Sequence, residues 1–189
     1  MLKEENNKSI DYWSIPDVFT SETCNHLIEV LDKEDKRKAA IVGEDGVAEV
    51  IDTEIRNVSK IQLPVFKGPG ATLLGAGLFI NSQAWNFNLK MGDQAEYLVY
   101  EPDGHYVSHV DCKNDPSQEL CRKITVLAFL NDDFEGGKFY IEVSSKRHYP
   151  PQKKGSVLAF PSYIIHGVEP VTKGVRRSIV AWLVGPYFK

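Results

Sequence analysis

Two side chains that bind metal ions well lie two positions apart in the stretch GHYVSHVD, residues 104–111. They are His109 and Asp111, and the longer sequence EYLVYEPDGHYVSHVD has the pattern of a strand, a turn and a second strand. Because alternate residues of a strand point to the same face, we expect both side chains on one side of a sheet. The stretch therefore predicts part of a metal site that needs at least one further ligand.

The best candidate for a third ligand among the remaining histidines is His166. It follows two β-rich runs and lies in a predicted strand that ends with GVEPV. By contrast, His105 comes directly after Gly104 in a tight turn, and His148 lies in the polar connection SKRHYPP. His26 lies on a predicted helix, where a partly exposed surface position is the simpler interpretation.

His109, Asp111 and His166 would together form a site with two imidazoles and one carboxylate. A facial triad of this kind leaves coordination positions open, which suits non-haem Fe(II) and its O₂ chemistry. The spacing alone is a weak signal, because a satisfied buried histidine on a strand pair and a turn aspartate would give the same pattern.

A second feature strengthens the oxygenase interpretation. An oxygenase that uses 2-oxoglutarate must hold the far carboxylate of this cosubstrate, and a buried arginine can do so with two parallel hydrogen bonds. Arg176 opens the predicted strand RRSIVAWLV ten residues after His166. Strand alternation places Arg176, Ser178, Val180 and Trp182 on one face, which predicts a cosubstrate pocket. The alternative, a solvated charge at a sheet edge, fits Arg177 better.

Length and composition agree with a single globular domain: 189 residues, 42% hydrophobic and 25% charged. The net charge of −4 argues against nucleic-acid binding, which usually needs a basic patch. No apolar run approaches the roughly 18–20 residues that a membrane helix needs, and no signal-peptide pattern is present. Cys24, Cys112 and Cys121 are odd in number without CxxC spacing, which predicts a reducing, cytoplasmic location. A disulfide between Cys112 and Cys121 is the less favoured alternative.

The secondary-structure pattern changes along the chain. We expect helices over residues 19–35 and 68–87, and strands or a loop over residues 42–63. The strands expected after residue 95 cover residues 96–101, 105–110, 122–131, 137–142, 155–160, 163–168 and 175–184. These patterns predict a mainly β fold with some helix: a jelly-roll core (95–185) flanked by a helical N-terminal support region (1–94), within one domain, 1–189.

Four stretches, taken in order, resemble the prolyl 4-hydroxylase type of 2-oxoglutarate/Fe(II)-dependent dioxygenase. They are YEPDGHYVSHVD, RKITVLAFLNDDFEGGKFYI, KKGSVLAFPS and HGVEPVTKGVRRSIVAW. The resemblance covers residues 96–185 well and the N-terminal helices more loosely. It implies a double-stranded β-helix core, with His109, Asp111 and His166 as iron ligands and Arg176 as the anchor of the 2-oxoglutarate C5 carboxylate.

The same resemblance assigns roles to several aromatic residues. Tyr100 matches a tyrosine whose hydroxyl reaches the cosubstrate, Tyr106 an aromatic near the metal and substrate, and Trp182 an aromatic that lines the site. Phe129 is a departure, because several family members have a tyrosine there that bonds the cosubstrate, and phenylalanine cannot donate a hydrogen bond. We therefore expect the C5 carboxylate to rely on Arg176 and Tyr100, with Thr125, Ser178 and Trp182 as further cosubstrate-binding candidates.

The implied reaction is hydroxylation of a substrate C–H with Fe(II), 2-oxoglutarate and O₂, releasing succinate and CO₂, with ascorbate as a further candidate cofactor. A prolyl residue in a peptide or protein is the favoured substrate. A free amino acid or another small molecule is the first alternative, followed by other protein side chains or nucleic acid. The loops at residues 42–55 and 112–121 are candidate gates, and their acidic residues would suit a basic or neutral substrate.

Two other classes share the metal ligands. One is a non-catalytic metal-binding β-barrel or sensor module, and the other is a zinc hydrolase or cupin-type isomerase. Neither needs a carboxylate anchor such as Arg176 on the pocket face. The oligomeric state has no signal in the sequence.

Overall fold

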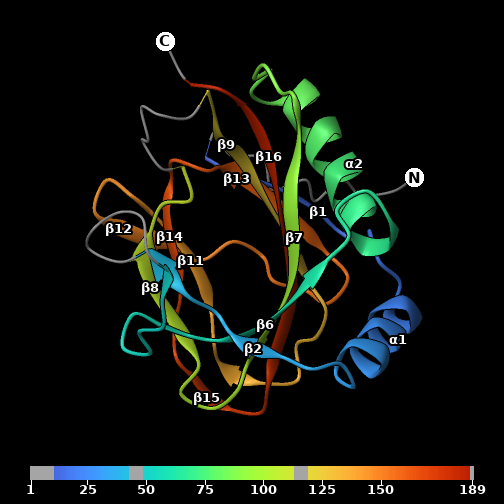
Figure 1. Cartoon of the computed structure of the whole chain (residues 1–189), viewed down its shortest axis with the longest axis vertical. Helices are drawn as coiled ribbons and strands as arrows, with labels where there is room; N and C mark the ends of the chain where they lie inside the picture. Colours follow the sequence, from blue (N-terminus) through green and yellow to red (C-terminus); the bar gives the residue numbers. More distant parts are fainter. Residues whose placement is uncertain (1–10, 43–48, 113–118, 188–189) are drawn as a thin grey trace.

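Two antiparallel β-sheets face each other in the computed structural model, which describes residues 11–42, 49–112 and 119–187 (Figure 1). The larger sheet contains, in spatial order, β1 (Trp13–Ile15), β13 (Val157–Pro161), β9 (Leu120–Phe129), β16 (Arg176–Pro186), β7 (Met91–Tyr100), β6 (Ser59–Leu63) and β2 (Arg37–Lys38). The smaller sheet contains β12 (Lys146–His148), β11 (Phe139–Val143), β14 (Ile165–Val168), β8 (His105–His109) and β5 (Arg56–Asn57). Two short ribbons pair β3 (Ile41–Val42) with β4 (Glu49–Val50), and β10 (Glu135–Gly136) with β15 (Val171–Lys173).

The chain alternates between the two large sheets in the manner of a jelly roll. It passes from β7 in the larger sheet to β8 in the smaller, back to β9, across to β11 and β12, back to β13, across to β14 and back to β16. Each of these strands except β12 corresponds to one of the strands expected from the sequence, with ends that differ by a few residues. This is the arrangement of the predicted jelly-roll core.

The position of β16 inside the larger sheet explains why its sequence is almost continuously apolar. Its residues Ile179, Ala181 and Leu183 belong to a cluster on the outer face of the larger sheet. Val180 and Trp182 belong to a second cluster between the two sheets. Because the strand is buried on both faces, polar residues at alternate positions would have been costly.

The outer cluster is covered by two helices, α1 (Ser21–Leu31) and α2 (Gly68–Gln83) (Figure 1). The Oγ1 of Thr20 caps α1 by accepting a hydrogen bond from the Thr23 N–H at 3.2 Å. Gly77, which weakens helix propensity, lies where α2 meets the sheet. A Cβ at this position would come within 2.4 Å of the Leu183 side chain, so glycine permits the close approach.

The region 1–94 is more than the helical support region that the sequence predicts. It supplies β1, β2, β6 and the first part of β7 to the larger sheet, and β5 to the smaller one. β5 and β6 lie in the stretch 42–63 that the sequence left open between strands and a loop, whereas β1 and β2 were not expected, because short runs carry little periodicity. None of the helices in the described residues is both long and apolar enough to cross a membrane.

The end of α1 is joined to the larger sheet by a cluster around Asp32. Arg177 donates from Nε to the Asp32 carboxylate at 2.8 Å, and the Tyr97 hydroxyl donates to the same group at 2.9 Å. Burial works to raise the pKa of Asp32, but these hydrogen bonds lower it below its ordinary value. A carboxyl group with a lowered pKa stabilises the fold above its unfolded-state pKa and loses this contribution as the pH falls through its folded-state pKa.

We therefore expect Asp32→Asn to lower the free energy of unfolding by about 1–2 kcal/mol at neutral pH. The difference from the wild type should shrink as the pH falls below about 4, where the unfolded-state carboxyl becomes protonated. Urea unfolding at a series of pH values measures this, with the exposed Asp35→Asn as control. Equal stability of wild type and Asp32→Asn at neutral pH would contradict the expectation.

Candidate active site

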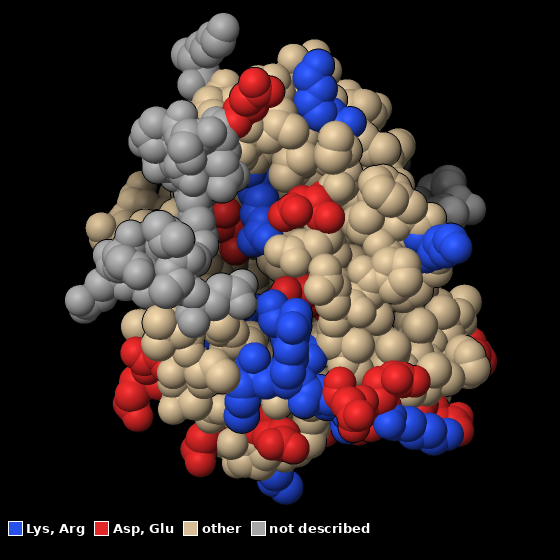
Figure 2. Space-filling view, viewed as in Figure 1, with Lys and Arg blue, Asp and Glu red and all other residues tan. Residues whose placement is uncertain are grey.

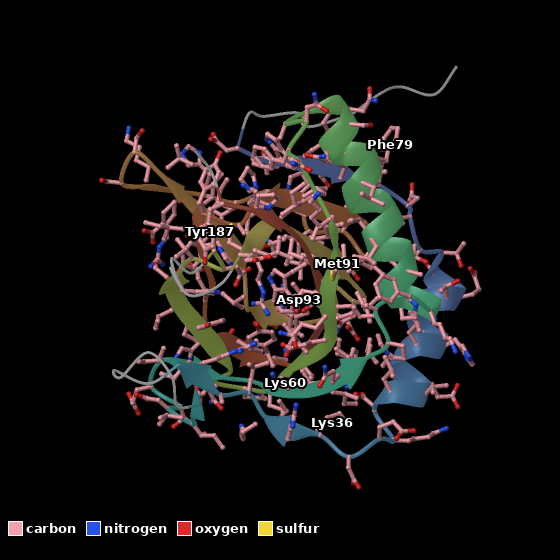
Figure 3. The ribbon with its side chains drawn as sticks, turned by 45° about the horizontal axis from the view of Figure 1, so that its top comes forward. Lys36, Lys60, Phe79, Met91, Asp93 and Tyr187 are labelled. Carbon is pink, nitrogen blue, oxygen red and sulfur yellow. The ribbon has the colours of Figure 1, made fainter. Side chains whose placement is uncertain are left out.

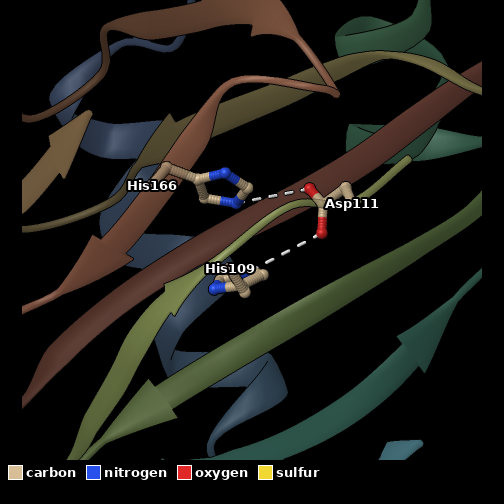
Figure 4. A group of neighbouring side chains, drawn as sticks. All are labelled: His109, Asp111 and His166. Carbon is tan, nitrogen blue, oxygen red and sulfur yellow. Dashed lines mark ion pairs between the residues drawn. The ribbon is translucent and has the colours of Figure 1, made fainter. Parts of the chain in front are cut away.

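The predicted metal ligands meet at one end of the smaller sheet. His109 ends β8, and His166 in β14 is its direct Cα partner across the antiparallel pair, so the two rings lie 4.2 Å apart. Asp111 lies just beyond β8, where its N–H donates to the carbonyl of Ser162 at 2.9 Å. One ligand atom from each of the three residues lies within 4.8 Å of the others, and Figure 4 shows the side chains facing one another.

Both imidazoles are oriented by backbone carbonyls. Nδ1 of His109 lies 2.8 Å from the Val107 carbonyl, and Nδ1 of His166 lies 2.9 Å from that of Ile164. A carbonyl can only accept, so each Nδ1 carries a proton, and in the neutral form of either ring Nε2 keeps its lone pair. Both Nε2 atoms face Asp111, at 3.7 Å and 3.4 Å from its carboxylate oxygens. This is the tautomer that an imidazole needs in order to bind a metal through Nε2.

The pKa values of His109 and Asp111 also favour metal binding by these residues. Burial, followed by repulsion from His166, lowers the pKa of His109 to about 3, so the ring is neutral at physiological pH. Burial works to raise the pKa of Asp111, but the two neighbouring histidines lower it well below its ordinary range. Two imidazoles and one carboxylate fit a divalent ion such as Fe(II).

A pocket of about 190 Å³ extends from the triad to Arg176, between the two sheets. The face of β16 that was predicted to line it does so: Arg176, Ser178, Val180 and Trp182 all contribute to the wall. His109, Asp111 and His166 line the same pocket, so the metal ligands and the arginine share one cavity.

Arg176 is only 1% exposed, and its partners leave one edge of its guanidinium free. Nη1 donates to the Ser178 hydroxyl at 3.0 Å, whereas Nε and Nη2 have no hydrogen-bond partner among the described residues. The rings of Tyr100 and Phe129 lie 5.0 Å and 5.7 Å from Cζ. A buried guanidinium edge with two unused N–H groups is costly on its own and matches a carboxylate bound through both oxygens.

The glycine pair Gly136–Gly137 makes room for this arginine. Both residues have positive φ, +70° and +57°, which favours glycine. A Cβ at Gly137 would lie 2.8 Å from Val171 and 3.3 Å from Cδ of Arg176. The GG sequence therefore lets the turn pass close to the arginine stem.

Two residues that were predicted to bind the cosubstrate lie against Asp111. Thr125 donates from Oγ1 to Oδ2 of Asp111 at 2.7 Å, and Trp182 donates from Nε1 to the same oxygen at 2.9 Å. Thr125 pairs in register with Trp182, whereas Phe129, four residues along, pairs with Ser178 beside Arg176. The structure thus corrects the expected contact of Thr125 with the C5 carboxylate, because Thr125 lies at the metal end of the pocket.

Tyr106 stacks on the ligand His109, with ring centroids 3.5 Å apart and an interplanar angle of 19°. The Arg56 guanidinium covers the Tyr106 ring at 4.7 Å from its centroid. Burial is the main cause that raises the pKa of Tyr106 to about 12, so its hydroxyl stays protonated. Tyr106 therefore both lines the pocket and restrains the ring of His109.

Sequence reasoning missed a charged group on the wall. Glu96, which is 3% exposed, bonds Lys60 and lies 3.5 Å from Arg56. Alternation along β7 places Glu96 on the same face as Tyr100, and this could have identified it. Arg56 and Lys60 come from the stretch that the sequence left open between strands and a loop.

The remaining histidines and the cysteines are placed as follows. His105 begins β8 rather than lying in the turn, and backbone carbonyls of Asp103 and Glu54 bind its two ring nitrogens. His26 and His148 are exposed. Cys24, Cys112 and Cys121 are free thiols.

Comparison with known proteins agrees with this geometry. The model of the 2OG-Fe(II) oxygenase superfamily matches residues 95–184. A PKHD-type hydroxylase of Rippkaea orientalis is 36% identical over 87 residues, which cover 44% of this chain and 39% of that protein. One from Idiomarina loihiensis is 41% identical over 84 residues, covering 44% and 38%. The chain thus aligns with about two fifths of the length of these curated relatives.

Solved structures match over almost the whole chain. A prolyl 4-hydroxylase of Pseudomonas putida superposes with a TM-score of 0.70 at 16% identity, covering 92% of this chain and 91% of that one. A prolyl hydroxylase of Trichoplax adhaerens, solved with a hypoxia-inducible-factor peptide fragment, has a TM-score of 0.70 at 16% identity, covering 93% and 84%. At this identity the likeness shows a shared fold.

A facial triad in a jelly roll, with a buried unpaired arginine edge in the same pocket, fits the class of 2-oxoglutarate- and Fe(II)-dependent dioxygenases. Residues 95–184 thus resemble the 2OG-Fe(II) oxygenase superfamily, whose cofactors are Fe(II), 2-oxoglutarate and O₂.

Proposed function

We propose that this protein hydroxylates a C–H bond of a prolyl residue in a peptide or protein, converting 2-oxoglutarate and O₂ to succinate and CO₂. The single observation that carries the proposal is the pocket shared by the triad and the free edge of Arg176. A metal site alone would suit a hydrolase or a sensor module. The carboxylate-binding arginine on the same wall is what those classes do not require.

Different residues along the pocket would bind the iron and the cosubstrate. His109, Asp111 and His166 would hold Fe(II), and Arg176 would hold the C5 carboxylate of 2-oxoglutarate, with Tyr100 beside it. When bound, the iron and its cosubstrate supply the oxidising chemistry that turns the substrate C–H into C–OH and 2-oxoglutarate into succinate and CO₂.

The chain also keeps this region dry. Leu127, Phe139 and Phe160 line the pocket between the arginine and the triad, and each is at most 5% exposed. An apolar wall excludes water and strengthens the ionic contacts of Arg176 and Asp111. The protein thus contributes binding, orientation and exclusion of water.

The charges at the described rim of the pocket indicate which substrate charges would be favoured. Arg56, Lys60 and Arg122 line it, with Glu96 between Arg56 and Lys60, and Figure 2 shows Lys and Arg side chains gathered beside a hollow on this face. Asp93, which pairs with Arg122 at 3.0 Å, is 40% exposed (Lys60 and Asp93 are labelled in Figure 3). The acidic loop residues expected to suit a basic or neutral substrate lie mostly in 43–48 and 113–118, outside the described residues. The rim therefore supports a substrate segment with acidic residues near the target proline.

The test is a set of proline peptides in which Glu, Gln or Lys flanks the proline, incubated with the enzyme, Fe(II), 2-oxoglutarate and ascorbate. We expect mass spectrometry to find one added oxygen atom on proline. The Glu-flanked peptide should have a KM about 3- to 10-fold lower than the Lys-flanked one, because rim ion pairs are individually weak. Arg122→Gln should reduce this preference.

Oxygen on another residue of the peptide would contradict the prolyl target and favour another protein side chain. The absence of a peptide product while a free amino acid is hydroxylated would contradict the peptide substrate and favour the small-molecule alternative. Equal KM values for all three flanks would contradict the acidic preference alone. We also propose the reducing, cytoplasmic location that the odd number of cysteines without CxxC spacing predicts.

A further inference from the structure

Hydrogen bonds from neighbouring side chains fix the orientation of the Asp111 carboxylate, and this orientation affects how Asp111 would bind a metal. Its Oδ2 accepts from Thr125 at 2.7 Å and from Trp182 at 2.9 Å. One carboxylate oxygen has about two lone-pair sites, so these two donors use the capacity of Oδ2. Oδ1 accepts no hydrogen bond from the part of the chain that the structure describes.

Ser162 supports both the side chain of Asp111, through Thr125, and the backbone of Asp111. Its hydroxyl lies 2.9 Å from Oγ1 of Thr125, and both groups are buried. Because the Thr125 proton goes to the carboxylate, which can only accept, the Ser162 hydroxyl must donate to Thr125. The Ser162 carbonyl also accepts from the backbone N–H groups of Asp111 and Cys112, each at 2.9 Å.

The indole of Trp182 is itself restrained. The Arg122 guanidinium lies over the indole ring at 3.8 Å from its centroid, and Asp93 binds Arg122 at 3.0 Å. Trp182 is 5% exposed and belongs to the cluster between the sheets. Rotation of the indole away from Asp111 would break this stacking and expose apolar surface.

We infer that Thr125, Ser162 and Trp182, here called the Asp111 clamp, are positioning residues that make Asp111 a metal ligand through Oδ1 alone. The inference rests on the metal site of the proposed function and deepens it. A carboxylate that bound through both oxygens would take up a coordination position that the cosubstrate or O₂ needs. The clamp keeps Oδ2, which lies 3.4 Å from Nε2 of His166, engaged with the protein. It leaves Oδ1, which lies 3.7 Å from Nε2 of His109, without a hydrogen bond from the described residues.

Partners that orient metal ligands typically change metal affinity by about 10- to 100-fold when removed. We therefore expect Thr125→Val and Trp182→Phe each to raise the dissociation constant for Mn(II) by about this factor, measured by isothermal titration calorimetry. Thr125→Ser keeps the hydroxyl and should stay within about threefold of the wild type, well below that range. Trp85→Phe, in the cluster outside the larger sheet, controls for the loss of an indole elsewhere.

Circular dichroism of the metal-free variants separates affinity from folding. Valine is close in shape to threonine, so Thr125→Val should retain the fold and can decide the matter even if Trp182→Phe does not fold. A crystal structure with Co(II) bound to the wild type should show Oδ1 as the ligand atom and Oδ2 bound only to Thr125 and Trp182. In Thr125→Val, we expect the carboxylate to rotate toward binding through both oxygens.

The outcomes separate the two proposals. If the wild type binds no Mn(II), the metal site and the proposed function fail together. If the wild type binds Mn(II) but a folded Thr125→Val binds it equally tightly, only the clamp is overturned. Ligation of Co(II) through Oδ2 in the wild type would also overturn it.

Discussion

Replacing Arg176 with glutamine should raise the KM for 2-oxoglutarate by at least about 100-fold, because a buried charged pair with two hydrogen bonds contributes on the order of 3 kcal/mol. Arg176 is 1% exposed, and its Nε and Nη2 have no other partner among the described residues, so nothing in the described wall can replace it. Arg176→Lys should have an intermediate effect, since lysine keeps the charge but not the planar pair of N–H groups. Initial rates of succinate formation at varied 2-oxoglutarate measure the change.

The neighbouring arginine is a matched control. Arg177 points to the opposite face of β16, where it pairs with Asp32 at 2.7 Å. Arg177→Gln should lower stability but leave the KM for 2-oxoglutarate within about threefold of the wild type, since a distant substitution acts nearly independently. If Arg176→Gln retained the wild-type KM, the carboxylate would have to be bound elsewhere in the pocket.

Removing a metal ligand should have the largest effect on turnover. We expect His109→Ala and Asp111→Ala to lose stoichiometric iron and to lower succinate formation by about 1,000-fold or more, as is typical when a group that acts as part of a unit is lost. Elemental analysis of protein reconstituted with Fe(II) without oxygen measures the first effect, and a coupled succinate assay measures the second.

The control for these ligand variants is His148→Ala, since His148 is an exposed histidine outside the pocket. It should bind iron and turn over like the wild type. Full turnover by either ligand variant would mean that the triad is not the iron site.

Much of the site could be predicted because its residues lie on regular strands. His109 and His166 end up as direct partners across β8 and β14, and the alternation along β16 correctly placed Arg176, Ser178 and Trp182 on the pocket wall. These relations follow from a period of two, which a sequence displays directly.

Relations between strands could not be predicted in the same way. That Thr125 lies opposite Trp182, and that both bond Asp111, depends on the register of β9 against β16, which includes a bulge between Leu183 and Val184. A single sequence does not specify a register across strands that lie far apart in the chain, so Thr125 was assigned to the wrong end of the pocket.

The N-terminal half was the least predictable part of the fold. β5 is two residues long and its Arg56 covers Tyr106, yet nothing in its short sequence distinguishes it from a loop. Its position comes from pairing with β8, which is a tertiary contact rather than a local preference.

The most direct test of the central claim is whether the wild-type protein decarboxylates 2-oxoglutarate in an iron-dependent way. Purified protein would be incubated with Fe(II), ascorbate, O₂ and 2-oxoglutarate labelled at C1, with Asp111→Ala alongside. We predict release of labelled CO₂ with an equal amount of succinate, abolished by a chelator and absent in Asp111→Ala. Tight binding of Fe(II) and 2-oxoglutarate without labelled CO₂, even in the presence of the proline peptides, would contradict it and indicate a binding module of the same fold.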